Sequence, residues 1–255
     1  MVGLGALPLP ARDAVVRLLP PTDALRALPF VSHDTLAALS WGNELRLPIG
    51  KFKASTVEEA VQQAHAPRRA WELGTLDLRG KKVADVSALA SCAALHTLKL
   101  SYCDRVTNLS ALAGCAMLHS LDLLNCGRVT DVSALAGCAN LHTLELRDCL
   151  GVTDVSLARC ATLQVLSLRD CLSVTDVSAL AGCAALHTLE SSHSRELTDV
   201  SVLAGCMKLR ALDLSFCRRL TDVSALVNCA TLHELNLSAT SVTDVSALAG
   251  CASLH

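Results

Sequence analysis

Aromatic side chains are scarce in this chain. They make up 2% of its 255 residues, so the apolar half of the sequence consists mainly of leucine, alanine and valine. Charged residues reach only 18%, yet a hydrophobic content of 51% excludes a disordered chain. The formal net charge of -2 gives no basic excess, so we expect neither a nucleic acid nor an anionic membrane as partner.

Signals for secretion and membrane insertion are also missing from the sequence. Residues 1–11 lack a basic start and contain Pro8 and Pro10, which is unlike a secretory signal peptide. No uncharged apolar run reaches the ~18 residues of a membrane-spanning helix. We therefore expect an intracellular, cytoplasmic protein whose thirteen cysteines are reduced.

A unit of 22 or 23 residues repeats from residue 73 onward. The string LHTLKLSYCDRVTNLSALAGCAM over residues 95–117 recurs as LHSLDLLNCGRVTDVSALAGCAN over residues 118–140. The unit starts are Leu73, Leu95, Leu118, Leu141, Leu163, Leu186, Leu209 and Leu232, with a ninth at Leu254. A period in the twenties with the pattern L-x-x-L-x-L-x-x-C is the leucine-rich-repeat signature. It predicts an α/β solenoid, in which a curved parallel β-sheet carries short 3₁₀ or helical turns on its convex side.

Each position of the unit, counted from its first leucine, has an expected role. Leucines at positions 1, 4 and 6 point inward, and positions 3 and 5 of the short strand point outward. Valine or leucine at positions 12 and 15 and leucine at position 18 close the core. Because each unit buries its apolar face only against its neighbours, we expect a quasi-one-dimensional array.

Two stretches resemble known repeat families. The run VTDVSALAGCANL over residues 129–141 resembles the internalin-type leucine-rich repeat, which carries a similar I-T-D-I-S-P-L segment. The cysteine at position 9 resembles the cysteine-containing repeats of F-box leucine-rich proteins. The resemblance covers residues 73–255 and implies a solenoid that binds other proteins, although partners differ between such arrays.

The cysteines fall into two columns. Position 21 holds Cys92, Cys115, Cys138, Cys160, Cys183, Cys206, Cys229 and Cys251, and position 9 holds Cys103, Cys126, Cys149, Cys171 and Cys217. No C-x-x-C pair exists, so we expect no metal site. Disulfides between neighbouring units are sterically conceivable at about 5 Å. We interpret the cysteines instead as small buried hydrophobes that fit a tight turn.

Other repeated polar residues also receive a structural interpretation. Histidine occupies position 2 at His96, His119, His142, His187, His233 and His255. A stacked ladder could bind metal or sense pH, but Gln164 and Arg210 interrupt it, so we expect solvated side chains. The recurrent Thr-Asp at positions 13 and 14, as in Thr130-Asp131, is expected to cap backbone N–H groups. With no nucleophile elbow, phosphate loop or H-E-x-x-H helix, we expect neither an enzyme nor a cofactor.

Columns that vary between units and point outward are the expected recognition surface. Position 5 forms an acidic stripe, position 7 supplies arginines, and position 8 holds the array's two aromatic residues. The candidate partner-binding residues are Asp122, Glu145, Glu190 and Asp213 at position 5, Arg147 and Arg169 at position 7, and Tyr102, Asn125, Asp148, Asp170, His193 and Phe216 at position 8. Aromatic and arginine side chains dominate interface energies. We expect Arg147, Asp148, Arg169 and Asp170 to form a central cluster.

The unit beginning at Leu186 departs from the pattern. Ser191 replaces the inward leucine at position 6, and Ser194 replaces the cysteine at position 9. Burying a hydroxyl in place of leucine is expected to cost a few kcal/mol. The unit is therefore either a drifted copy, which we favour, or a local site around His193.

Residues 1–72 contain no cysteine and no repeat. We predict a helical head over 1–50 and a helical linker or cap over 51–72, ahead of the repeats at 73–255. The order of Leu7-Pro8, Val15-Val16, Pro20-Pro21 and Leu36 resembles an F-box, a module that docks on the adaptor of SCF ubiquitin ligases, here through residues 7–40. A cap over the first unit is the alternative. At the other end, residues 253–255 are expected to leave an apolar cross-section open, as in a truncated chain or one with an end-on partner.

The sequence thus predicts a non-catalytic scaffold that binds a protein partner on its concave face. The alternative is a substrate receptor of an SCF-type ubiquitin ligase, with the head on the adaptor and the repeats on substrate. An extracellular adhesion module is a third possibility, which the missing signal peptide disfavours.

Overall fold

The computed structural model describes residues 74–254, and residues 1–73 and 255 lie outside its description. The predicted helices of the head, its F-box-like order and the cap over 51–72 all fall outside the described residues. The described residues belong to the repeat array alone.

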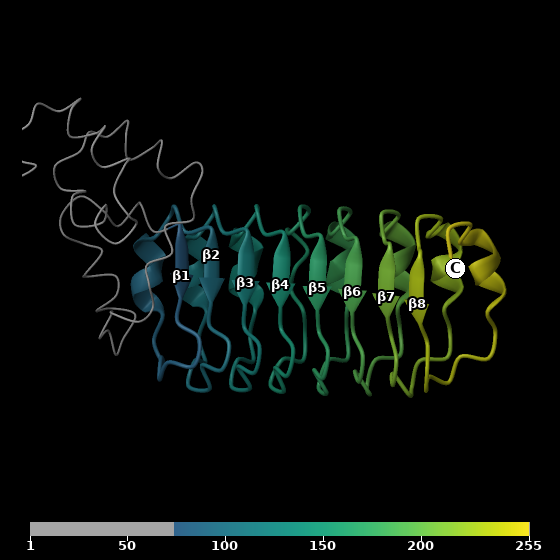
Figure 1. The fold of residues 1–255 in the computed structure, drawn as a ribbon, viewed down its shortest axis with the longest axis horizontal. Coiled ribbons are helices and arrows are strands. Elements are labelled where there is room, and N and C mark those ends of the chain that lie inside the picture. The colour runs from purple at the N-terminus through teal and green to yellow at the C-terminus, as the bar shows by residue number, and fades with distance from the viewer. Residues whose placement is uncertain (1–73, 255) are drawn as a thin grey trace, which may run out of the picture. The chain divides into compact units, whose positions relative to one another are not determined.

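The array is built on one parallel sheet whose strands lie in chain order (Figure 1). Each strand is three residues long and pairs in register with the next, so that Leu98 faces Leu121 and Leu121 faces Leu144. The strands are β1 (Thr75–Asp77), β2 (Thr97–Lys99), β3 (Ser120–Asp122), β4 (Thr143–Glu145), β5 (Val165–Ser167), β6 (Thr188–Glu190), β7 (Ala211–Asp213) and β8 (Glu234–Asn236). The prediction of eight stacked parallel strands is confirmed.

Short 3₁₀ helices lie behind the sheet in almost every unit (Figure 1). They are η4 (Ser87–Ser91), η5 (Ser110–Gly114), η6 (Ser133–Gly137), η7 (Ser178–Gly182), η8 (Ser201–Gly205), η9 (Ser224–Asn228) and η10 (Ser246–Gly250). The unit from Leu141 has none, because its SLARC segment is one residue shorter than the usual SALAGC. There an isolated bridge joins Asp154 to Asp176 instead.

The core runs without interruption between the sheet and the 3₁₀ helices. In the unit from Leu95, the leucines at positions 1, 4 and 6, together with Val106, Leu109 and Leu112, are at most 1% exposed. Within the described residues, the equivalent leucines and valines are buried from Leu76 of the first unit to Leu226 of the seventh, as the periodicity predicts. In the eighth unit Leu235, Leu237 and Leu248 are only partly buried.

The aspartates at position 14 hold the start of each 3₁₀ helix. The Ser133 backbone N–H donates to Asp131 Oδ1 at 2.7 Å, and the Ser133 hydrogen bonds lower the pKa of this carboxyl. The same backbone contact recurs at Asp85, Asn108, Asp176, Asp199, Asp222 and Asp244. The predicted capping role is confirmed, and these side chains are therefore engaged by the backbone of their own unit.

All thirteen cysteines are buried and unpaired. The Cys126 thiol donates to the Leu100 carbonyl of the preceding unit at 3.2 Å, and Cys149 donates to Leu123 at 3.1 Å. Burial raises the pKa of Cys126 and of Cys149 to about 12. The thiols therefore stay protonated at neutral pH and tie neighbouring units together, which confirms that they are buried structural side chains.

Candidate functional site

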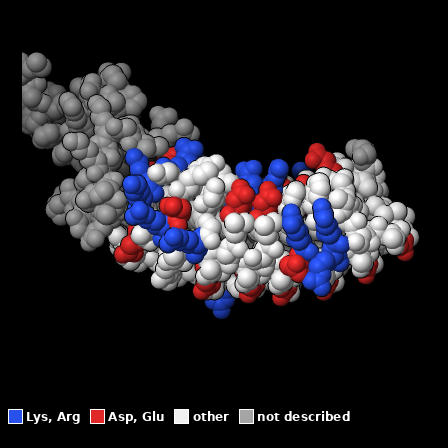
Figure 2. Space-filling model, turned by 90° about the horizontal axis from the view of Figure 1, so that it is seen from below, with Lys and Arg blue, Asp and Glu red and all other residues white. Residues whose placement is uncertain are grey.

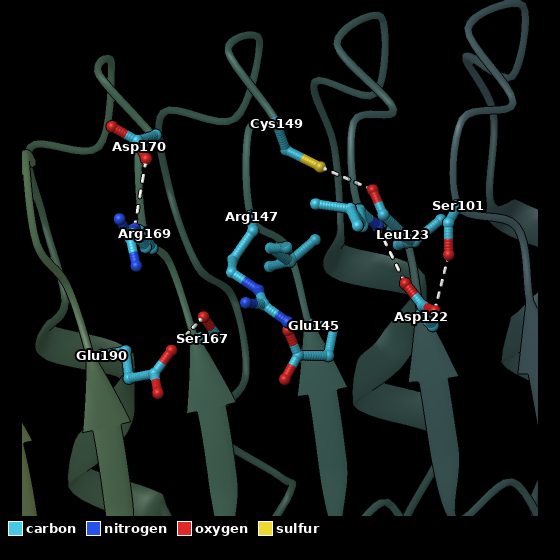
Figure 3. A network of polar contacts seen from close by, with 12 residues as sticks. Ser101, Asp122, Leu123, Glu145, Arg147, Cys149, Ser167, Arg169, Asp170 and Glu190 are labelled. Atoms are coloured by element: carbon cyan, nitrogen blue, oxygen red, sulfur yellow. Dashed lines mark hydrogen bonds and ion pairs between the residues drawn. The ribbon is translucent and has the colours of Figure 1, made fainter.

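The concave face consists of the outward side chains of the strands and the residues at positions 7 and 8, which follow each strand (Figure 3). All twelve residues predicted to bind a partner belong to this face. Because the strands pair in register, equal positions form straight columns across neighbouring units.

Position 8 has a left-handed backbone in every unit. Its eight residues have φ between 57° and 66°, namely Gly80, Tyr102, Asn125, Asp148, Asp170, His193, Phe216 and Ala239. The backbone N–H of position 8 holds this conformation by donating to the position 7 carbonyl of the next unit, as Tyr102 does to Leu124 at 2.7 Å. The residue type at position 8 varies between units, but its backbone conformation is the same in all of them.

This constraint changes the meaning of the aromatic residues. Glycine, asparagine and aspartate adopt left-handed conformations readily, whereas for other residues the conformation costs about 1 kcal/mol or more. Asn125, Asp148 and Asp170 follow that preference. Tyr102 and Phe216 do not, and neither do His193 and Ala239. Aromatic rings at this position do not help the backbone, and backbone strain of this kind concentrates at functional sites.

Both aromatic side chains reach solvent, as predicted. Tyr102 is 58% exposed in the loop after β2, and Phe216 is 38% exposed in the loop after β7. The Phe216 ring stacks on His193 with centroids 4.4 Å apart, and His193 Nδ1 lies 3.7 Å from Asp170 Oδ1. Tyr102 stands at one end of the face, and the His193–Phe216 ring pair stands at the other.

The arginines at position 7 pair differently from the predicted central cluster (Figure 3). Arg147 Nε donates to Glu145 Oε2 at 2.9 Å rather than pairing with Asp148, whereas Arg169 Nε lies 3.4 Å from Asp170 Oδ2. Arg147 lies two residues after Glu145 on one side of the strand, so the two side chains meet directly. The cluster is thus two separate ion pairs.

Position 7 is also less open than expected. Ser101, Ser192 and Ser215 are at most 5% exposed, and so they offer little to a partner. The Ser101 hydroxyl donates to Asp122 Oδ2 at 2.6 Å, which turns it toward the face of the sheet. From β2 to β7, the arginines of this column project farther outward than its serines.

Several carboxylates of the face form no ion pair, although Lys99 is the register neighbour of Asp122 in the adjacent strand. Asp122 accepts from Ser101 and from the Leu124 N–H, Glu190 accepts from the Ser167 hydroxyl at 2.9 Å, and Asp213 accepts from the Ser215 N–H. Among residues 74–254, no lysine or arginine lies within ion-pair distance of Asp122, Glu190, Asp213 or Asp148. Positions 5, 7 and 8 together hold seven carboxylates and four basic side chains, so the face is electronegative.

The negative charges of the face contribute to a raised pKa of Glu145. Burial raises its pKa above the usual value, and the charges of Glu190 and Asp122 raise it further, against the lowering effect of Arg147. A carboxylate whose pKa is raised by like charges would be relieved by an incoming cation.

The two serines of the unit from Leu186 satisfy each other. The hydroxyls of Ser191 and Ser194 are fully buried and lie 3.0 Å apart. The exchange at position 9 supplies the hydrogen-bond partner for the exchange at position 6, which lowers the expected cost of burying a hydroxyl in place of leucine. The lost leucine volume remains.

The histidines of position 2 form a short stack. His96, His119 and His142 have ring centroids 5.1 and 5.0 Å apart, and each Nδ1 lies 2.6 Å from the carbonyl two residues earlier. Parallel rings aim their remaining nitrogens in parallel, which does not converge on one ion. Residues 74–254 contain no group of three or more potential ligands placed to hold a metal ion. No helix in that range is long and apolar enough to cross a membrane.

The sequence interpretation missed one group of exposed side chains. Positions 10 and 11 form a second turn after each strand from β2 to β7, and Arg195, Arg218, Leu150 and Leu172 are exposed there. The signal for them is the same as for positions 5, 7 and 8, because these two columns also vary from unit to unit.

Comparisons with known proteins agree with this architecture. A family model described as a leucine-rich repeat matches residues 205–226. No curated protein matches the chain in sequence. The described residues form a leucine-rich-repeat solenoid, a fold that commonly serves as a non-catalytic scaffold for protein interactions.

Several solved structures are similar to this chain. Internalin C2 from Listeria monocytogenes is 29% identical, with a TM-score of 0.63 over 72% of this chain and 80% of that one. The internalin inlF from the same organism is 21% identical, with a TM-score of 0.48 over 72% of this chain and 66% of that one. The functional domain of InlJ from Listeria monocytogenes, which includes a cysteine ladder, is 18% identical, with a TM-score of 0.47 over 72% of this chain and 43% of that one.

Proposed function

We propose that the array is a non-catalytic scaffold whose concave face binds an extended, basic segment of a partner protein. The observation that carries this proposal is the electronegative face between two exposed aromatic ends. Asp122, Glu190 and Asp213 are already held in place by hydroxyl and backbone donors, so they meet a cation without reorganising.

The spacing of the anchors favours a protein over a small molecule. Tyr102 and Phe216 lie five units apart, which corresponds to about 24 Å at the spacing of neighbouring strands. An extended segment of seven or eight residues spans roughly this distance. Its basic side chains would meet the unpaired carboxylates, and its apolar side chains would pack on the rings at either end.

A displayed library of random peptides tests the proposal without knowledge of the natural partner. Peptides selected on the full-length chain are expected to carry a net positive charge. They should bind the Glu190→Gln/Asp213→Asn variant at least tenfold more weakly, since both amides keep an oxygen for Ser167 and Ser215 but lose the charge.

The matched control is Asp199→Asn/Asp222→Asn, which removes the same charge from the convex side of the same two units. It should change affinity less than twofold. Selected peptides without a positive charge, or equal losses in both variants, would refute binding at the concave face.

A further inference from the structure

The turns formed by positions 10 and 11, together with the shorter loop of Lys81 and Lys82 after β1, make a separate surface, which we call the loop edge (Figure 2). Here the charge balance is reversed, because seven basic residues face two acidic ones. The basic residues are Lys81, Lys82, Arg105, Arg128, Arg195, Arg218 and Arg219, and the acidic ones are Asp104 and Glu196. In a chain with a net charge of -2, this edge is a local concentration of positive charge.

The basic residues are divided into two groups along the edge (Figure 2). One group belongs to the first three units and the other to the sixth and seventh. Between them the second turns carry no charge and expose Leu150 and Leu172, with Asp148 and Asp170 at position 8 of the same units.

The second group is built on a fixed backbone. The Ser241 hydroxyl donates to the Arg218 carbonyl at 2.6 Å. Arg219 Nη1 donates to Glu196 Oε2 at 2.5 Å and joins the turns of the two units. Arg195 and Arg218 are exposed and have no acidic partner among residues 74–254.

We propose that this second group is a docking surface for an acidic segment of a partner protein, with Arg195 and Arg218 as its unpaired anchors. The two arginines occupy the same position in adjacent units, about 4.8 Å apart along the backbone stack. Alternate side chains of an extended peptide repeat at roughly 6.8 Å, within reach of two flexible guanidinium groups. Each guanidinium offers a planar fork that matches a carboxylate.

The interval of uncharged second turns between the two basic groups favours a short acidic segment over a long polyanion or a membrane. A stiff polyanion or an anionic bilayer that covered both basic groups would also have to approach Asp148, which has no basic ion-pair partner among residues 74–254, and the exposed apolar Leu150 and Leu172. Like charges oppose such contact. A short acidic segment instead fits within the second group alone, and a protein surface can present it.

The test measures binding of fluorescein-labelled deca-glutamate to the full-length chain at about 50 mM NaCl. Arg195→Gln/Arg218→Gln should weaken binding at least tenfold, whereas Lys208→Gln/Arg210→Gln should change it less than twofold. The control residues are exposed in the same part of the array but precede the strand instead of following it. About 300 mM NaCl should bring the wild-type affinity close to that of the arginine variant.

Labelled deca-lysine separates this proposal from the concave-face proposal. Its binding should be unchanged by Arg195→Gln/Arg218→Gln and weakened by Glu190→Gln/Asp213→Asn. Equal losses of deca-glutamate binding in the two basic variants would overturn the docking surface. Phosphatidylserine vesicles and a thymidine decamer serve as competitors for the labelled deca-glutamate. The choice of a protein partner would be overturned if either competitor displaced the label at a lower concentration than unlabelled deca-glutamate does.

Discussion

Restoring the repeat pattern at Ser191 and Ser194 should stabilise the array strongly only when both residues change. The two hydroxyls satisfy each other at 3.0 Å inside a core where the neighbouring position 6 residues, Leu168 and Leu214, are fully buried. Ser191→Leu gains about 1.5–3 kcal/mol of apolar burial but leaves the Ser194 hydroxyl without its partner, at a cost of about 1–2 kcal/mol. The single change should therefore raise the free energy of unfolding by only ~1 kcal/mol.

The double variant Ser191→Leu/Ser194→Cys should gain about 2–3 kcal/mol. A cysteine at position 9 donates to the position 6 carbonyl of the preceding unit, as Cys171 does to Leu146 at 2.9 Å. Ser194→Cys alone should destabilise by ~1 kcal/mol, because it removes the partner of the Ser191 hydroxyl. The coupling free energy between the two sites is thus expected to be about 2–3 kcal/mol.

Urea unfolding followed by far-UV circular dichroism measures all four members of this cycle. The matched control is the reverse exchange one unit later, where Leu214→Ser should cost about 2–5 kcal/mol and Leu214→Ser/Cys217→Ser about 1 kcal/mol less. Strictly additive effects at Ser191 and Ser194, or a double variant no more stable than wild type, would refute the argument.

The buried thiols, the altered sixth unit and the titration of Glu145 each allow a further prediction. Native protein should react slowly with a thiol reagent at about pH 8, since burial raises the pKa of eight cysteines to about 11 or 12. Denatured protein should show thirteen reactive thiols, and a count near one would indicate disulfides. Hydrogen exchange should show β6 opening before β4 and β7, because the Ser194 N–H contact to Ser191 is long at 3.4 Å; equal protection of the three strands would contradict this. As the pH falls from neutral through the raised pKa of Glu145, protonation of Glu145 should weaken binding of a selected basic peptide and increase the contribution of Glu145 to the free energy of unfolding. Glu145→Gln should flatten the pH profiles of affinity and of stability in that window, and unchanged profiles in the variant would argue against this role of Glu145.

The fold was predictable because its determinants are local and repeated. The leucine period specifies the inward positions, and eight copies of it leave a stacked parallel sheet as the consistent solution. The capping aspartates and the buried cysteines were predictable for the same reason, since each recurs at one position of the unit.

The candidate site was less predictable because it depends on backbone conformation and on neighbouring units. The left-handed backbone at position 8 has a trace in the sequence, where Gly80, Asn125 and Asp148 share that column. The choice of Glu145 as partner of Arg147 depends on side-chain geometry that spacing alone does not specify. The hydrogen bond between Ser191 and Ser194 could be predicted only by treating the two departures from the repeat pattern as a coupled pair.

The affinity of a selected basic peptide for Tyr102→Asn/Phe216→Asn tests the central claim most directly. Asparagine is the native residue of the same left-handed column at position 125, so the exchange removes two rings without straining the backbone. We predict an unchanged or slightly higher free energy of unfolding and an affinity at least fivefold lower, which corresponds to about 1 kcal/mol. Unchanged affinity in a stably folded double variant would contradict binding across the concave face.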